Sequence, residues 1–220
     1  ELEGKEINDM DANRRLVFQK DILLTKSEAR DIIDEFERQD KSGSIRNKRQ
    51  ALRRNRTDEQ LWMEGVKYAF EPTNASQSPS SCEEERDKLM KGFRLAAKAW
   101  EENTCINFTE IEVDHETAEN ETEIDFLYVG GDGTEDCLSH VGKYGGYQPL
   151  ILGKGCEAFV YVAHEIGHAL GLYHTQSRHD RFQHIKLNWN KISREGLKYE
   201  FVKLSKAENR NLQLPYVLAV

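Results

Sequence analysis

The stretch "AHEIGHALGLYH", residues 163–174, limits the possible folds of this chain more than any other segment. An α-helix has about 3.6 residues per turn, so His164 and His168 lie on one face, one turn apart. Gly171 tolerates positive φ and can end the helix, which lets His174 approach from another side. The spacing predicts three imidazoles that converge on one metal ion, carried by a largely apolar, buried helix over 157–172.

Three neutral histidines predict a catalytic zinc ion rather than a structural one, because they leave a coordination position for water. Zinc lowers the pKa of that water towards about 7 and polarises a scissile carbonyl, while a neighbouring carboxylate takes the proton. Glu165 directly follows His164, and we assign it the role of general base. The alternative is a histidine-rich helix whose rings only make hydrogen bonds. The fixed offsets of Gly171 and His174 disfavour it.

Charge and hydropathy exclude some function classes. The net charge of −8 argues against a general attraction to nucleic acid or to anionic membranes. No apolar run approaches the roughly 18 residues that cross a bilayer. The 220 residues suffice for one main domain and a smaller appendage. Because the chain starts at Glu1 without a signal peptide, we expect a processed chain or a fragment.

Cysteines and glycosylation motifs favour a secreted protein. The four cysteines lack C-x-x-C spacing, so disulfides are expected rather than a four-thiolate zinc site. Four reduced thiols in a cytosolic protein are the alternative. Asn-x-Ser/Thr motifs, which are modified only in secreted proteins, occur at four positions. The cysteines are Cys82, Cys105, Cys137 and Cys156, and the motifs begin at Asn55, Asn74, Asn107 and Asn120.

The hydrophobic pattern indicates an α+β fold. Alternating or continuous apolar runs predict an extended piece at 15–25 and strands at 65–70, 105–113, 123–130 and 148–153. Pro149 favours an edge position for the last of these. Two further helices are predicted, one after a cap at Thr25 or Ser27 and one over 84–102. The second helix has an apolar face formed by Leu89, Phe93, Ala96, Ala97 and Trp100.

A basic, apolar-poor segment at 37–57 predicts an exposed linker. It contains "RNKR", which ends at Arg49 and has the arrangement that proprotein convertases cut. We expect cleavage there, which would release a chain that begins at Gln50. The alternative is a solvated run of charge.

The pattern H-E-x-x-H-x-x-G-x-x-H is that of the metzincin endopeptidases, and its surroundings resemble the astacin family, particularly the nematode members. The similar segments are "LWMEGVKYAF", "AAKAWEENTCINF" and "CLSHVGKYGGYQPLILGKGC". The resemblance implies a catalytic domain with a twisted sheet and a zinc-binding helix. It also implies a Cys137–Cys156 disulfide and a substrate-binding edge strand at about Gly146 to Leu152, onto which a peptide adds as a further strand.

The segment "FQKD" resembles the propeptide motif F-x-G-D of this family, whose aspartate reaches the zinc and displaces the catalytic water. Carried over, that zymogen ligand is Asp21, and Lys20 stands where the motif has glycine. A carboxylate is a hard oxygen donor that zinc accepts. The alternative is an acidic residue that merely lies beside a strand.

Two segments depart from the family pattern. After His174 the family has H-E-x-x-R-x-D-R-D-x-Y, whereas this chain has "HTQSRHDRFQH". Arg178, Asp180 and Arg181 match, but the glutamate that helps to anchor the mature N-terminus is replaced by Thr175. The stretch "NRNLQLPY" resembles the approach to the family's Met-turn, and "VLAV" follows it. We therefore expect a C-terminally truncated domain whose lower subdomain is largely missing.

These patterns predict a secreted, extracellular zinc metalloendopeptidase in zymogen form, with one Zn²⁺ per chain. Residues 1–49 would form a propeptide with an inhibitory segment and a basic cleavage linker, and 50–220 an incomplete astacin-like peptidase domain. Its partners would be extracellular protein or peptide substrates and an activating proprotein convertase. The alternatives are a catalytically silent peptide-binding form and a structural zinc domain.

Overall fold

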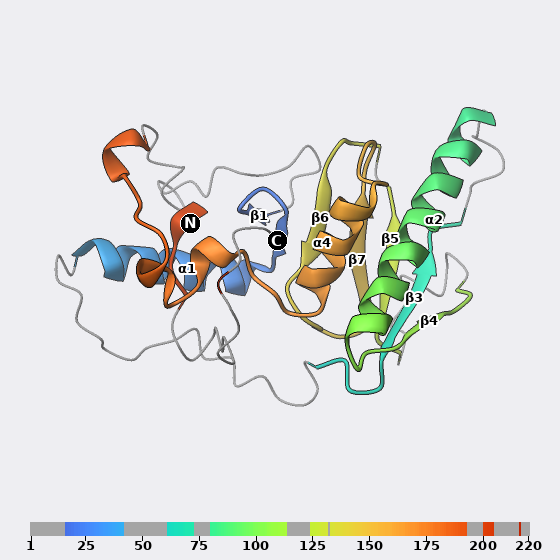
Figure 1. Ribbon diagram of the computed structural model, residues 1–220, viewed down its shortest axis with the longest axis horizontal. Coiled ribbons are helices and arrows are strands. Elements are labelled where there is room, and N and C mark those ends of the chain that lie inside the picture. The colour runs from blue at the N-terminus through green and yellow to red at the C-terminus, as the bar shows by residue number, and fades with distance from the viewer. Residues whose placement is uncertain are drawn as a thin grey trace. The chain divides into compact units, whose positions relative to one another are not determined.

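The computed structural model describes residues 16–41, 61–72, 80–113, 124–131, 133–192, 200–204 and 216. Side chains at 34–41 and 80–82 are outside this description. The chain divides into two compact units, one of residues 56–172 and one that combines 1–55 with 173–220. Figure 1 labels the main elements of both units. Within the described residues, no helix has the length and apolar character needed to cross a membrane.

The unit of residues 56–172 contains a mixed sheet in the order β6-β7-β5-β3-β4. Three neighbouring pairs are parallel, β3 with β4, β3 with β5 and β5 with β7, whereas β6 and β7 are antiparallel. The strands are β3 (Val66–Phe70), β4 (Phe108–Glu110), β5 (Phe126–Gly130), β6 (Cys137–His140) and β7 (Tyr147–Leu152).

Helices α2 (Ser80–Asn103) and α4 (Phe159–Ala169) cover one face of this sheet (Figure 1). Alternation along the strands directs Val66, Leu127 and Leu150 towards the helices, where they join Phe93 of α2 and Ile166 of α4 in the main core. The opposite face has a smaller buried cluster formed by Ala69, Phe126 and Tyr128. The expected apolar face of the second helix is confirmed, since all five of its residues belong to the core or pack against it.

Strand β7 is an interior strand of this sheet, which corrects two expectations. It pairs with β5 on one side and with β6 on the other, so the segment at about Gly146 to Leu152 is not an edge. Pro149 lies inside the strand, opposite Tyr128 of β5. Proline removes only one donor, and the backbone N–H groups of neighbouring residues still pair with both adjacent strands. The hydrophobic pattern does not predict β6.

The Cys137–Cys156 disulfide is present and ties β6 to the loop ahead of α4. Cys105 is an exposed free thiol, and the Cys82 side chain lies outside the described residues. The strand expected over 105–113 is confined to β4, three residues long.

In the other unit, the extended piece expected at 15–25 is a hairpin. Its strands β1 (Leu16–Phe18) and β2 (Ile22–Leu24) pair antiparallel. Helix α1 (Lys26–Lys41) follows, and Thr25 caps it. The Glu28 amide donates to the Thr25 hydroxyl at 3.3 Å, and the Thr25 amide donates to the Glu28 carboxylate at 2.7 Å. This reciprocal pair is a capping box, which fixes where the helix begins.

The same unit contains short 3₁₀ turns from the later part of the chain, η2 (Thr175–Ser177), η3 (Arg181–Gln183) and η4 (Trp189–Lys191). The hairpin contacts this later segment directly. The Gln19 side-chain amide donates to the hydroxyl of Ser177 at 2.8 Å and to the backbone carbonyl of Glu200. Residues more than 150 positions apart in the sequence therefore support one another within one unit.

Candidate metal centre

Helix α4 ends as the glycine in the motif predicts. Gly171 has a φ of 103°, which favours glycine. Its amide donates to the His168 carbonyl at 2.7 Å, and the Leu172 amide donates to the Gly167 carbonyl at 3.0 Å. These two bonds form a Schellman motif, which satisfies carbonyls that the last helical turn leaves without partners.

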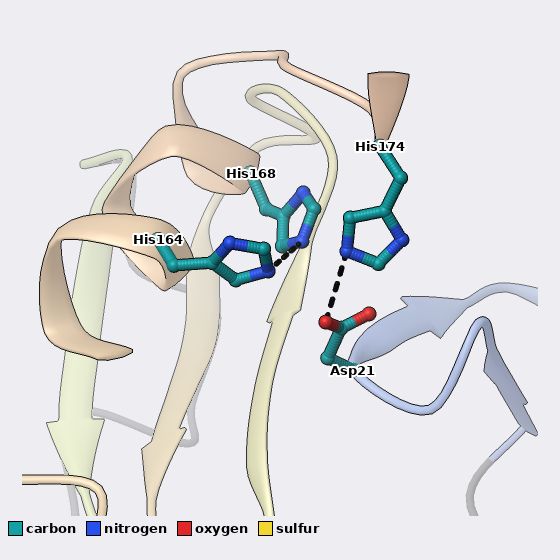
Figure 2. A group of neighbouring side chains, drawn as sticks. All are labelled: Asp21, His164, His168 and His174. Carbon is teal, nitrogen blue, oxygen red and sulfur yellow. Dashed lines mark hydrogen bonds and ion pairs between the residues drawn. The ribbon is translucent and has the colours of Figure 1, made fainter. Parts of the chain in front are cut away.

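The end of the helix also determines which ring nitrogen of one imidazole carries the proton. His168 is fully buried, and its Nδ1 lies 2.7 Å from the Leu172 carbonyl oxygen. A carbonyl oxygen can only accept, so Nδ1 carries the proton and Nε2 keeps its lone pair for a metal. Figure 2 shows the His164 ring beside it, with the two Nε2 atoms 3.0 Å apart. Two ligands at about 2.0–2.1 Å from a tetrahedral zinc ion would have their nitrogens about 3.4 Å apart, so this pair is suitably arranged for zinc.

Two tryptophans hold α4 at the level of these rings. The Trp62 indole donates to the Ala169 carbonyl at 2.8 Å, and the Trp100 indole donates to the Ala163 carbonyl at 3.1 Å. Glu165, the expected general base, is 1% exposed. A carboxylate with so little access to solvent needs local compensation for its charge, and such positions are common in catalytic sites.

The other unit brings together the remaining predicted metal-binding side chains. Asp21 lies at the end of the β-hairpin turn, and its Oδ2 is 3.0 Å from Nε2 of His174 (Figure 2). Lys20 has a φ of 76°, so it adopts the left-handed conformation that the glycine of the F-x-G-D motif would favour. The lysine therefore preserves the backbone geometry of the turn, at a conformational cost.

His174 has a second partner that the sequence did not predict. Its Nδ1 lies 2.9 Å from Oε1 of Gln19, and Gln19 is itself buried. A metal-binding histidine generally donates its other ring N–H to an oxygen, which orients the ring. Gln19 occupies the variable position of the propeptide motif. No spacing rule would have singled it out.

The segment after His174 contains a buried basic cluster. Arg178 donates two hydrogen bonds to Asp180, at 3.0 and 2.9 Å, and these bonds hold the pKa of that carboxyl below its usual value. Arg181 is 2% exposed and donates to the backbone carbonyls of Gln176 and Phe201. Burial lowers the pKa of Arg181 to about 10, which leaves it charged near neutral pH. Of the three residues that match the family, Arg178 and Asp180 thus pair with each other, and Arg181 holds the backbone at Gln176 and Phe201.

Tyr216 packs on the same cluster. Its ring stacks on His184 with centroids 4.5 Å apart, and its hydroxyl donates to the Thr175 carbonyl at 3.0 Å. The guanidinium of Arg178 lies 5.0 Å from the centre of the ring. The His184 ring is therefore engaged in packing against Tyr216.

Among the other expected sites, Asn107 is exposed and its side chain is accessible for glycosylation. The cleavage site at Arg49 and the motifs at Asn55, Asn74 and Asn120 lie outside the described residues. Each unit thus supplies one pair of candidate metal-binding side chains, two imidazoles in one and an imidazole with a carboxylate in the other. Nitrogen and oxygen donors of these kinds are ligands that zinc accepts.

Comparison with known proteins gives a consistent result. Residues 54–219 match the family model described as Astacin (Peptidase family M12A). Zinc metalloproteinase nas-31 of Caenorhabditis elegans is 33% identical over 201 residues, which cover 91% of this chain and 29% of the relative. Zinc metalloproteinase dpy-31 of Teladorsagia circumcincta is 30% identical over 220 residues, covering 98% of this chain and 31% of the relative. The chain therefore spans about a third of the length of these curated relatives.

The solved structure of high choriolytic enzyme 1, a hatching enzyme zinc-protease from Oryzias latipes, matches with a TM-score of 0.53 and 25% sequence identity. The match covers 73% of this chain and 71% of that chain. It confirms the expected α+β, astacin-like fold, and the names of the relatives identify zinc as the cofactor. Because this family model matches residues 54–219, which are most of the chain, the chain belongs to the astacin family of peptidases.

Proposed function

We propose that this protein is a secreted zinc metalloendopeptidase, made as a zymogen, that hydrolyses peptide bonds in extracellular proteins. The observation that carries the proposal is the arrangement of the imidazoles on α4. Their Nε2 atoms are 3.0 Å apart, and the Leu172 carbonyl holds the proton of His168 on the opposite nitrogen. Two rings prepared in this way are suited to binding a metal.

We assign His174 as the third ligand. It lies only two residues after Leu172, so its Cα can be at most about 7.6 Å from that of Leu172. Its Nδ1 faces the side-chain oxygen of Gln19, which leaves Nε2 for the ion. Three neutral imidazoles give a catalytic set with an open position for water or substrate. In the uncut chain we assign that position to Asp21, whose carboxylate lies beside Nε2 of His174.

Glu165 supplies the proton transfers of the proposed reaction. When bound, zinc polarises the scissile carbonyl and lowers the pKa of a water molecule. The Glu165 carboxylate takes a proton from the attacking water and then delivers it to the nitrogen of the leaving amine. Its position next to His164 on α4, with 1% exposure, supports this role, because a buried base does not exchange its proton freely with bulk solvent.

Activation is assigned to the linker. In this proposal a proprotein convertase cuts after Arg49 in "RNKR" and separates an inhibitory propeptide, 1–49, from the peptidase domain, 50–220. Cleavage allows Asp21 to leave, so that water can enter. The disulfide and the exposed motif at Asn107 support an extracellular location, where disulfides persist and glycosylated asparagines occur.

The proposal is tested with Glu165→Gln, measured after the linker has been cut. The amide is nearly isosteric but cannot accept the proton of water, so kcat/KM on a fluorogenic peptide should fall about 10²- to 10⁴-fold. Zinc content, measured by elemental analysis, should be unchanged. Glu102→Gln, at an exposed position on α2, is the matched control and should retain full activity.

A Glu165→Gln protein as active as its parent would show that the base lies elsewhere. If the parent binds peptides tightly but never cleaves them, the chain is a peptide-binding form and the proposed enzyme activity is wrong.

A further inference from the structure

The orientation of the Gln19 amide is determined by its partners. Its nitrogen donates to the backbone carbonyl of Glu200, which can only accept, and to the Ser177 hydroxyl at 2.8 Å. The opposite end of the amide, Oε1, therefore faces Nδ1 of His174 at 2.9 Å. It follows that Nδ1 donates, and that the lone pair of the neutral His174 ring is on Nε2.

We propose that Gln19 is a second anchor of the inhibitory hairpin and a positioning residue for His174, which it holds in the metal-binding tautomer. This inference rests on the proposed function, in which His174 is a zinc ligand and Asp21 blocks the site. It adds that the hairpin is attached to the third ligand through two side chains. Release of the propeptide would then change the hydrogen bonding of His174 as well as the coordination of the ion.

One short turn contacts both nitrogens of the same ring. Asp21 lies 3.0 Å from Nε2, and Gln19 lies 2.9 Å from Nδ1 on the opposite side (Figure 2 shows the first contact). Residues at alternate positions of the turn can reach the ring because Gln19 and Lys20 both have positive φ, 55° and 76°. That conformation is unfavourable for residues other than glycine, so the surrounding contacts must maintain it.

A glutamine is the side chain that these partners require. Glutamate could accept from His174, but it has no N–H to donate to the Glu200 carbonyl and would place a negative charge against it. Asparagine has the right amide but is one methylene shorter. With 5% exposure, Gln19 has little access to water that could replace a lost partner. An unsatisfied buried group is costly, so each of these changes should loosen the hairpin.

The test uses the intact chain and needs no substrate. Gln19→Asn keeps an amide and tolerates positive φ better than glutamine does, so any loosening cannot come from backbone strain. Gln19→Glu keeps the length but loses the donors. Lys20→Gln changes the exposed neighbour in the same turn and is the control. Two quantities are measured by NMR in zinc-loaded and chelator-stripped protein: the ¹⁵N shifts of the His174 ring and the hydrogen exchange of β1–β2 backbone amides.

We expect the parent and Lys20→Gln to show His174 protonated on Nδ1 alone in the zinc-loaded protein, with equally slow exchange in the hairpin. Gln19→Asn should broaden or shift the Nδ1 resonance and speed hairpin exchange about tenfold or more in both metal states. Gln19→Glu should also speed exchange. Unchanged ring shifts or unchanged exchange in Gln19→Asn would overturn the inference. Neither measurement depends on hydrolysis. The proposed peptidase activity can therefore be wrong while the role of Gln19 is right, and the role of Gln19 can be wrong while the activity is right.

Discussion

Lys20 holds a left-handed backbone conformation without being a glycine. Its φ is 76° and its side chain is exposed. The left-handed region costs an L-residue roughly 1–2 kcal/mol, whereas glycine avoids that cost but loses more entropy on folding. We expect Lys20→Gly to raise the free energy of unfolding by about 0.5–1 kcal/mol in urea titrations. Lys20→Ala keeps the cost and should change little. Equal destabilisation by both changes would mean that the lysine side chain itself stabilises the turn.

Tyr68 should lower the stability of the protein at alkaline pH. Burial, and then the charge of Glu110, raise the pKa of the Tyr68 hydroxyl to about 12. In the unfolded chain the same hydroxyl ionises near pH 10, so between these values unfolding releases a proton and stability falls as pH rises. The contribution of Tyr68 should decrease by about 1 kcal/mol between pH 9 and 11. Urea titrations at several pH values give the free energy of unfolding of the parent and of Tyr68→Phe. We expect this free energy to fall more steeply with pH in the parent, and equal pH dependence in both proteins would contradict the pKa shift.

Sequence spacing points to the candidate metal-binding side chains but not to the groups that orient them. The offsets of His164, His168 and Gly171 follow from helix geometry, so they can be recognised without a structure. Gln19 reaches Ser177 across 158 positions of sequence, and the Leu172 carbonyl is a backbone atom. Gln19 has no periodicity that predicts its role, because tertiary packing brings it to Ser177. The contact of the Leu172 carbonyl with His168 is local, and it depends on how the backbone turns after the helix, which residue spacing does not show.

At the scale of elements, α2 is held close to the loop ahead of α4. A Cβ added at Gly92 would fall well inside van der Waals contact with the backbone oxygen of Glu157, which cannot move aside as a flexible side chain can. Glycine to alanine normally stabilises a helix by up to about 1 kcal/mol, whereas overpacking costs about 1–3 kcal/mol. Gly92→Ala should therefore lower the free energy of unfolding by about 1–2 kcal/mol.

The control for this change is Lys91→Ala, at the exposed neighbouring position of the same helix. It should shift stability by less than about 0.5 kcal/mol when both variants and the parent are compared in thermal melts. If Gly92→Ala melts at or above the temperature of the parent, the two backbones are not in close contact at this point.

The elements that periodicity predicted well are the long or strongly patterned ones. The 84–102 helix appears as α2, and the five apolar positions of its predicted face are buried or packed against the core. Strand β6, "CLSH", is too short and too polar to stand out, and its pairing with β7 is set by tertiary contacts. Pro149 was misleading because a proline excludes only one ladder bond, and whether that bond is needed depends on the register.

At the scale of the molecule, the chain builds one unit from a continuous segment and the other from both of its ends. The main hydrophobic core of the 56–172 unit is formed by residues between Trp62 and Leu170, all from that segment. The other unit depends on contacts between the hairpin and residues after 172, such as those of Gln19 with Ser177 and Glu200. Removal of the N-terminal segment should therefore affect the two units differently.

We predict that deleting residues 1–49 will destabilise 173–204 and leave the core of 56–172 intact. The deletion removes the partners of buried groups such as His174 and Ser177, and local opening becomes easier where such contacts are lost. Hydrogen exchange followed by mass spectrometry should show about tenfold or faster exchange after residue 172, with α2, β5 and β7 unchanged. The converse variant changes the other unit. Cys137→Ser with Cys156→Ser removes the disulfide between positions 19 residues apart, and it should lower the free energy of unfolding of 56–172 by about 2–4 kcal/mol. Cys105→Ser, at the exposed free thiol, should alter neither pattern. Uniformly faster exchange across both units after the deletion would show that the two units fold as one cooperative body, and that the N-terminal segment stabilises all of it.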